Sequence, residues 1–219
     1  CYELYAKQHP NRITFGSETL PPDIALNWEK VKAIPSCIGD FTWTGWDYMG
    51  EPSTGLVKYE APPMEYGMGL PFPALNSQVG EFTITGNKRT CAYYHEVVIG
   101  NRNVPFIAVY RPEHYHEKEI LSPWSFGDTV CSYSYEGFEG KPIKAEIYSD
   151  AGEVELFLNG KSLGRKTITD EDKMVALYDF TYEPGELKAV NYRDGVACEE
   201  HTIRSASGER KLIVELESE

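Results

Sequence analysis

The sequence predicts an α/β part followed by an all-β part. Up to about Tyr110, helical spacing of apolar residues alternates with short strand-like runs, and this βα alternation implies a parallel sheet. From about Lys118, apolar residues recur at every second position, and Asn159-Gly160 and Asp194-Gly195 are strong hairpin signals. Short strands separated by such turns indicate an antiparallel β-sandwich.

The elements of the first half follow from its breakers and its apolar spacing. In chain order we expect a helix end at 2–8, a strand at 12–16, a helix between Asp23 and Pro35, a strand at 37–44 and a helix at 88–98. Asp23 follows two prolines and is the expected N-cap of the second helix. A loop rich in Pro and Gly spans about 45–78, and long loops in compact domains are often functional.

The second half is expected to contain strands and no helix after residue 118. The candidate strands are 143–148, 154–158, 174–182, 187–192 and 196–203. The predicted organisation is therefore an α/β part over 1–112, a β-sandwich over 118–205, and at 206–219 a linker with the first strand of a further, truncated domain. Two βα units cannot cover both faces of a parallel sheet, so we expect an excised piece of a longer protein.

Composition narrows the class of partner. The 219 residues carry a net charge of −13 with a pI of about 4.9, which argues against nucleic acid and disfavours anionic membranes. No apolar run approaches the ~20 residues of a membrane helix, and residues 1–9 show no secretory signal. The five cysteines are all more than thirty residues apart, which excludes CxxC metal sites and favours unpaired thiols. A reducing, cytoplasmic location is slightly favoured.

Candidate site residues follow the two predicted parallel strands. Glu18 comes directly after the first strand, where α/β folds place catalytic groups, so it is a candidate nucleophile or base. The bland alternative is an exposed loop carboxylate. Trp43, Trp46 and Asp47 follow the second strand, and flat indoles beside carboxylates suit a neutral sugar. The alternative for these residues is packing at the end of the sheet.

Other chemistry finds little support in the sequence. His114 and His116 share a face at i, i+2, but no third metal ligand is evident nearby, and an exposed linker is the favoured interpretation. Phosphate-binding loops of the GxxxxGK and GxGxxG types are absent, as is a Gly-x-Ser-x-Gly elbow. We therefore expect neither a metal nor a cofactor.

Several motifs together resemble glycoside hydrolase family 2, the β-galactosidase family. FGSET (15–19), GDFTWTGWDYMGEP (39–52) and GEFTITGNKR (80–89) look like the last two βα units of its catalytic TIM (β/α)8 barrel. GKPIKAEIYSDAGEVELFLNGKSLG (140–164) and YEPGELKA (182–189) resemble the immunoglobulin-like β-sandwich that follows this barrel in one bacterial branch. The resemblance covers about residues 1–205 in the expected order.

The resemblance implies roles for particular residues. Glu18 matches the catalytic nucleophile after barrel strand seven, and Trp43 matches the position after strand eight that lines the sugar subsite. The family is retaining and needs a second carboxyl group as acid and base, about 5–5.5 Å from the nucleophile. That group is the Glu of an Asn-Glu pair, which is absent from this chain. Thr83 stands where relatives often have Asp.

The function expected from these observations is that of a fragment of a retaining β-glycosidase. The expected substrate is a terminal non-reducing sugar, with β-galactosides favoured, and the fragment itself is expected to be inactive. Two alternatives stay open. A non-catalytic carbohydrate-binding module would carry its aromatic platform on the sandwich, yet Trp28, Trp43 and Trp46 precede it. A purely structural role is favoured for 118–205 taken alone. Self-association through uncovered strand faces is also expected.

Overall fold

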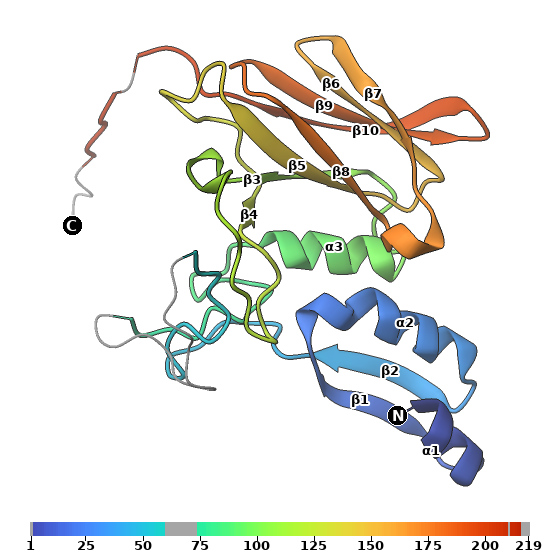
Figure 1. The fold of residues 1–219 in the computed structure, drawn as a ribbon. Helices are drawn as coiled ribbons and strands as arrows, with labels where there is room; N and C mark the ends of the chain where they lie inside the picture. The colour runs from blue at the N-terminus through green and yellow to red at the C-terminus, as the bar shows by residue number, and fades with distance from the viewer. Residues whose placement is uncertain (1, 60–73, 210, 216–219) are drawn as a thin grey trace.

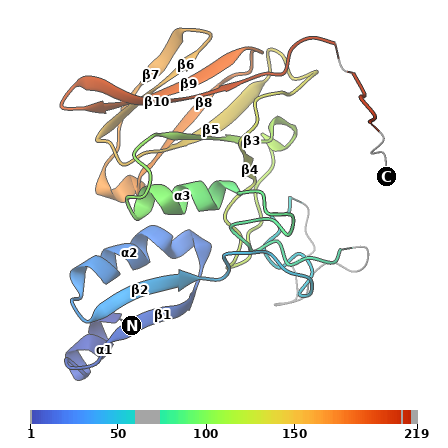
Figure 2. The ribbon, with the colours of Figure 1, turned by 180° about the vertical axis from the view of Figure 1, so that it is seen from behind.

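The computed structural model describes residues 2–59, 74–209 and 211–215. Figure 1 shows a small α/β part (α1, β1, α2, β2), a layered β part, and α3 between them. Viewed from behind, α2 and α3 again lie side by side where the two parts meet (Figure 2). None of the helices in these residues is long and apolar enough to cross a membrane.

The α/β part contains the predicted parallel strands. Its elements are α1 (Tyr2–Gln8), β1 (Thr14–Thr19), the short 3-10 helix η1 (Pro21–Asp23), α2 (Ile24–Ala33) and β2 (Cys37–Thr42). β1 and β2 pair in parallel, as predicted from the βα alternation. Val31 and Ile34 pack on Cys37, so the apolar side of α2 covers one face of this pair. Asp23 occupies the N-cap position of α2, but its side chain makes no capping hydrogen bond.

β1 differs from the expected strand at both ends. It starts at Thr14 and continues through Glu18 to Thr19, whereas the sequence predicted residues 12–16. The reason is a shift in register: Gly16 lies opposite Asp40, and Thr19 lies opposite Thr42, so pairing resumes after an irregularity. Glu18 therefore lies within the last residues of the strand, not in the loop after it.

The helix expected at 88–98 is present as α3 (Thr90–Val98). Tyr94, Val97 and Val98 are buried against Phe106 and Tyr148 of the β part. α3 thus forms the apolar contact layer between α2 and the sheets. Of the long loop expected at 45–78, residues 60–73 lie outside the described residues.

The β part consists of two four-stranded antiparallel sheets. One has the order β4-β3-β5-β8, and the other has the order β10-β9-β6-β7. The first sheet comprises β3 (Phe106–Tyr110), β4 (Thr129–Val130), β5 (Pro142–Tyr148) and β8 (Val175–Thr181). The second comprises β6 (Glu153–Leu158), β7 (Lys161–Thr167), β9 (Glu186–Arg193) and β10 (Val196–Arg204).

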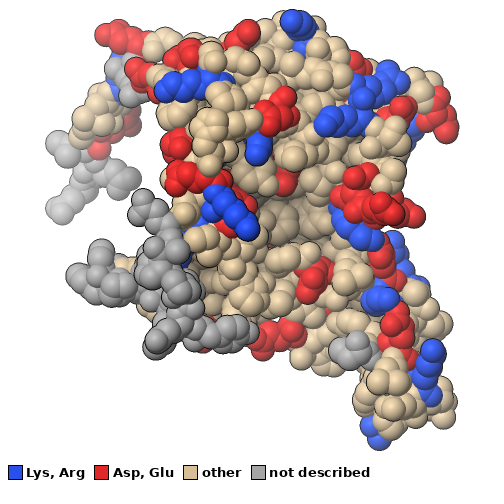
Figure 3. Space-filling view, viewed as in Figure 1, with Lys and Arg blue, Asp and Glu red and all other residues tan. Residues whose placement is uncertain are grey.

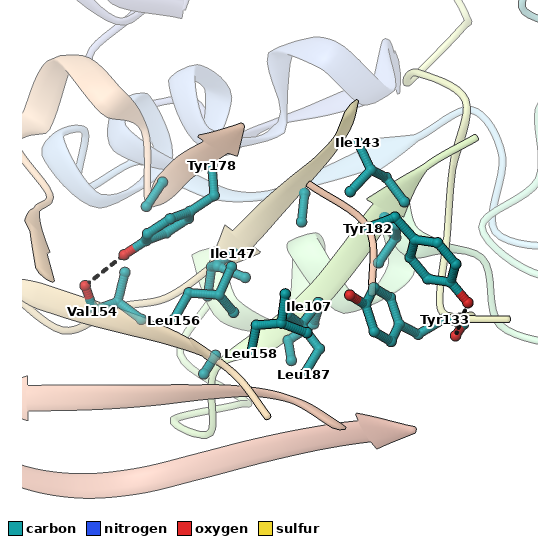
Figure 4. Close-up of a cluster of buried hydrophobic side chains, with 14 residues drawn as sticks. Ile107, Tyr133, Ile143, Ile147, Val154, Leu156, Leu158, Tyr178, Tyr182 and Leu187 are labelled. Carbon is teal, nitrogen blue, oxygen red and sulfur yellow. Dashed lines mark hydrogen bonds between the residues drawn. The ribbon is translucent and has the colours of Figure 1, made fainter. Parts of the chain in front are cut away.

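A shared apolar core joins the two sheets into a sandwich. Ile107, Ile143 and Ile147 of one sheet face Val154, Leu156, Leu158 and Leu187 of the other (Figure 4). Ile143 and Ile147 are fully buried at alternate positions of β5, so the period of two in the sequence places one face of the strand in the core. Tyr178 lies in this core and donates its hydroxyl to the Val154 carbonyl at 2.8 Å.

Both predicted hairpin turns are confirmed. Asn159 and Gly160 have φ values of 51° and 79°, and they connect β6 to β7. Asp194 and Gly195 have φ values of 51° and 77°, and they connect β9 to β10. Two successive left-handed residues define the type I′ turn, which Asn, Asp and Gly tolerate best.

The sandwich begins earlier than the sequence suggested. β3 starts at Phe106 and pairs with both β4 and β5, so it belongs to the sheet although the expected boundary lay at 112–118. Four of its five residues are buried, and a strand covered on both faces shows no alternation of apolar and polar residues. Two short 3-10 helices, η2 (Pro112–His114) and η3 (Asp170–Asp172), lie in the connections.

The strand expected after residue 210 is not formed in the part that the structure describes. Residues 211–215 belong to no strand, and Leu212, Ile213 and Val214 are mostly exposed. Figure 1 shows this segment leading away from the sandwich. Its alternation has no partner among the described strands.

His201 links the two sheets of the sandwich. Its Nδ1 accepts the backbone N–H of Ile107 at 3.2 Å, so β10 of one sheet holds β3 of the other. Its ring stacks on Phe106 at 5.3 Å between centroids. Burial, and to a smaller extent the charge of Arg102, lower the pKa of His201 below its usual 6.5.

Acid should therefore weaken this link. Because the folded-state pKa lies below the unfolded value, the contribution of His201 is complete above pH ~6.5 and is lost as the pH falls through the window below it. We expect the thermal midpoint to fall further between about pH 7.5 and 5.5 in the wild-type chain than in His201→Gln, whose amide accepts a hydrogen bond without titrating. Circular dichroism measures both midpoints, and equal falls would contradict this role.

Candidate active site

Glu18 stands at the carboxyl end of β1 and is exposed to solvent. It lines an open depression of about 650 Å³ along this strand, formed by residues of α1, β1 and the start of α2. Glu18 and Asp23 are the two carboxylates of this lining, which contains no lysine or arginine among the described residues. A carboxylate in such a place is open to a ligand that approaches from solvent.

A hydrogen-bonded cluster fixes the backbone beside Glu18. Asp40 of β2 accepts hydrogen bonds from the hydroxyl of Tyr2 and, at 2.8 Å, from that of Thr19. A Cβ on Gly16 would lie 2.0 Å from the Tyr2 hydroxyl and 2.1 Å from Asp40, so only glycine fits between them. Burial and the bond to Asp40 raise the pKa of Tyr2. The phenol therefore stays protonated and continues to donate.

Trp43 follows β2 and is joined directly to the end of β1. Its backbone N–H donates to the carbonyl of Thr19 at 2.8 Å. Trp43 is therefore bonded to the residue that directly follows Glu18. The peptide bond to Thr44 is cis, and the side chain of Trp43 is 38% exposed. The structure thus places these two predicted site residues at the same end of the parallel pair.

Trp46 lies further along the loop and has a different support. It is 56% exposed and stacks on Phe82, with ring centroids 5.4 Å apart and planes within 5°. A Cβ on Gly86 would lie 3.2 Å from the indole, so this glycine leaves room for the ring. Trp46 therefore presents an apolar surface separate from that of Trp43.

Asp47 is buried and hydrogen-bonded within the long loop. It is only 5% exposed, and its two carboxylate oxygens accept hydrogen bonds from Asn76 at 2.7 Å and Ser77 at 2.6 Å. The carboxylate thus ties the two sides of the long loop together. The geometry gives Asp47 a part in shaping the site, and direct contact with a sugar stays a prediction.

A second loop, around residues 80–82, is hydrogen-bonded to residues 43–47, which we call the tryptophan loop. Glu81 and Phe82 donate their N–H groups to Thr44 and Gly45, and Asp47 donates to Phe82. A Cβ on Gly80 would lie 2.3 Å from the Asp47 nitrogen, so a side chain there would force the loops apart.

Glu81 also holds His95 of α3, with the Oε1 to Nδ1 distance at 2.7 Å. Burial alone would lower the pKa of His95, but the bond and the charge of Glu81 outweigh burial and raise it. The loop that contains Glu81 is thereby anchored on α3.

The described residues offer no cluster of three or more His, Cys, Asp or Glu side chains suited to a metal ion. His114 stacks on Tyr59 at 3.8 Å and pairs with Glu117, which gives it a packing role. The described side chains at the site include carboxylates, hydroxyls and aromatic rings.

Tyr48 and Glu51 join Trp43 in a chain of hydrogen bonds that was not predicted from the sequence. The Trp43 indole donates to the Tyr48 hydroxyl at 3.3 Å, and Tyr48 donates to Glu51. Their spacing within DYMGE, directly after two tryptophans, was a usable signal. Asp40 was also not predicted as a site residue, although its position near the end of the second strand was a usable signal.

Comparisons with known proteins show what this chain is similar to. The sequence family described as "Domain of unknown function (DUF4982)" matches residues 140–199, which contain β5, β6, β7, β8 and β9 and the start of β10. A Formosa agariphila protein named "Putative beta-glucuronidase" is 31% identical over 94% of this chain and 17% of its own length. A beta-galactosidase of Bacteroides ovatus is 27% identical over 77% of this chain and 15% of its own.

Solved structures of glycosyl hydrolase family 2 members also resemble this chain. A glycosyl hydrolase family 2 member from Bacteroides cellulosilyticus is 33% identical, with a TM-score of 0.81 over 94% of this chain and 26% of that one. A second such member from the same species is 31% identical, with a TM-score of 0.73 over 94% and 24%. The chain thus spans about a sixth of its curated relatives and a quarter of these solved structures.

Relatives that match nearly the whole length of this chain are named as a beta-glucuronidase and as a glycosyl hydrolase family 2 member. More particularly, the resemblance seen in the sequence is confirmed, because the curated and solved relatives that match most of this chain are members of glycoside hydrolase family 2. The chain's predominance of β-sheet with few helices agrees with these relatives.

Proposed function

We propose that this chain supplies the nucleophile side of the active site of a retaining β-glycosidase, with Glu18 as the nucleophile. The observation that carries the proposal is the junction of β1 and β2. An exposed carboxylate and an exposed indole stand at the carboxyl ends of two parallel strands, joined by the hydrogen bond from Trp43 to Thr19. This is the edge at which barrel enzymes carry their catalytic groups.

The same proposal assigns β1 and β2 to strands seven and eight of a TIM barrel. The two-strand sheet leaves one edge of β1 without a partner among the described strands. Phe15, Ile38 and Phe41 on these strands, and Ile13 directly before β1, are each more than half exposed. An apolar surface of this kind calls for cover by further strands, and in the isolated chain it favours self-association. The sandwich, from Phe106 to Arg204, is the proposed immunoglobulin-like accessory domain.

Glu18 would act by attacking the anomeric carbon of a terminal sugar. The covalent glycosyl-enzyme is then hydrolysed by water, with a second carboxyl group acting first as acid and then as base. No Asn-Glu pair occurs in the chain, so the proposal places that group outside it. The part of this chain is to position the nucleophile and the Trp43 surface relative to each other.

A neutral sugar fits the lining better than a uronic acid does. Glu18 and Asp23 make the described depression acidic, and a second carboxylate on the substrate would be repelled there. Figure 3 shows basic and acidic side chains interspersed over the visible face of the molecule. We therefore keep β-galactosides as the proposed substrates, with β-glucuronides as the alternative suggested by the name of one relative.

Covalent labelling tests this assignment. A 2-deoxy-2-fluoro-β-galactoside with a good leaving group should trap the glycosyl-enzyme in the longer protein that contains this chain, and peptide mass spectrometry should locate the sugar on Glu18. Asp23→Asn is the matched control, because Asp23 lines the same depression and should be dispensable for labelling. Labelling of another carboxylate would refute the role of Glu18.

A further inference from the structure

Trp43 is held by a relay of hydrogen bonds that runs in one direction. Its indole N–H donates to the Tyr48 hydroxyl at 3.3 Å, and the Tyr48 hydroxyl donates to Oε2 of Glu51. The two rings also meet edge to face, with centroids 5.9 Å apart and planes at 77°. One hydroxyl thus accepts from the indole while it donates to the carboxylate, which uses both of its capacities.

The carboxylate makes this relay stronger than a neutral one. Hydrogen bonds to an ionised acceptor are shorter and stronger than bonds between neutral groups. Burial, and then the bond to Glu51, raise the pKa of Tyr48, so its proton stays in place as the donor. Because the indole N–H is taken up by Tyr48, Trp43 meets a ligand with the faces of its ring.

The turn that carries Glu51 adopts a conformation that side chains rarely take. Gly50, Glu51 and Ser53 have φ values of 109°, 44° and 61°, all in the left-handed region. Non-glycine residues there cost of order 1–3 kcal/mol each and persist only where surrounding contacts hold them. The Thr54 hydroxyl donates to the Glu51 carbonyl at 2.7 Å, and Ser53 donates its N–H to Asn76 at 2.8 Å.

Hydrogen bonds also connect this turn to the segment that precedes β4. The Ser122 hydroxyl donates to the Thr54 carbonyl at 2.5 Å. Lys58 and Ile120 exchange two backbone hydrogen bonds, at 3.2 and 2.7 Å. In both Figure 1 and Figure 2 the chain between η2 and β4 runs down beside this loop. The β part therefore reaches the loop that supports Trp43.

We propose that Tyr48 and Glu51 are positioning residues that fix the Trp43 indole as a sugar-binding surface, and that Ser122 anchors their turn. This inference rests on the proposed function, since it takes Trp43 as a surface for the sugar. It gives the segment before β4 a part in substrate binding, beyond that of a spacer. A surface held in one orientation binds without first having to order its own side chain, so loosening it weakens binding.

The expected effect is on KM. Tyr48→Phe keeps the ring but removes the hydroxyl, and a hydrogen bond of ordinary worth corresponds to a roughly three- to tenfold change. In the longer protein with a nitrophenyl β-galactoside, we expect KM to rise by about that factor while kcat stays within about twofold. Glu51→Ala should behave alike, whereas Glu51→Gln, whose amide oxygen still accepts, should recover most of the affinity. Ser122→Ala should shift KM in the same direction.

Tyr115→Phe is the matched control, because Tyr115 also donates its hydroxyl to a carboxylate, that of Asp179. Tyr115 contacts Asp179 of β8 and Lys144 of β5, so this variant should leave KM unchanged. Near-UV circular dichroism of the 219-residue chain, compared with that of Trp43→Phe, reports the Trp43 signal independently of activity. Tyr48→Phe should reduce that signal, and Tyr115→Phe should not.

Three results would overturn the inference, and the first two separate it from the proposed function. If Trp43→Ala raises KM but Tyr48→Phe changes neither KM nor the Trp43 signal, the positioning role is wrong while the sugar surface stands. If Trp43→Ala leaves KM unchanged, the surface itself is wrong, and the inference falls with it. A rise in KM for Tyr115→Phe equal to that for Tyr48→Phe would show a general loss of fold and would also contradict the inference.

Discussion

Replacing Glu18 by Gln should abolish glycoside turnover in the longer protein and leave sugar binding largely intact. The amide keeps the size and shape of the side chain but cannot attack the anomeric carbon. We expect kcat to fall by roughly 10⁴-fold or more, a scale typical of the loss of a catalytic nucleophile. Steady-state assays with nitrophenyl β-galactoside measure the loss, and calorimetry with galactose measures the binding that remains.

Two controls make this result specific. Asp23→Asn removes the other carboxylate of the same depression and should keep most of the activity. Glu18→Ala removes the carboxylate, and azide added to this variant should restore some turnover. The product should have the inverted anomeric configuration, because the external anion takes the place of the nucleophile. Undiminished turnover in Glu18→Gln would remove the nucleophile assignment altogether.

Local chemistry made much of the fold predictable. The turns at Asn159-Gly160 and Asp194-Gly195 depend on two residues each, and the structure has both. The alternation in β5 reports one buried face directly. β3 was not predicted as a strand of the sandwich, because nearly all of its residues are buried and its sequence does not show which face points to the core. The strand predicted after residue 210 had the right alternation, but nothing in the described structure pairs with it.

The site was less predictable because distant residues decide it. Glu18 lies inside β1 because pairing with Thr42 resumes beyond a shift in register, and no pattern within 12–19 reveals that shift. Asp47 had the residue type of a sugar ligand, but Asn76 and Ser77, about thirty positions later, occupy its oxygens. Type and spacing therefore located the strand ends, whereas contacts across the long loop determine which side chains face solvent.

The second large effect concerns the 219-residue chain on its own, which we expect not to hydrolyse glycosides. Retaining chemistry needs a proton donor at the leaving oxygen, and such general acid help is worth roughly 10²–10⁴-fold. The family supplies that donor from an Asn-Glu pair, and this chain has none. Asp47 cannot substitute readily, because both of its oxygens already accept hydrogen bonds in a buried position.

Positioning is lost together with the proton donor. The depression at Glu18 is open, and among the described residues the proposed barrel is represented by β1 and β2, two of its eight strands. Holding reactants in place accounts for ~7–11 kcal/mol of the barrier lowering in well-oriented systems, and an open half-site forfeits much of this. Purified chain and its Glu18→Gln variant, assayed side by side with nitrophenyl β-galactoside, should both give the uncatalysed rate. Turnover that disappears only in the variant would show that the chain contains its own acid, and Glu51, exposed beside Trp43 and Tyr48, would be the first residue to test.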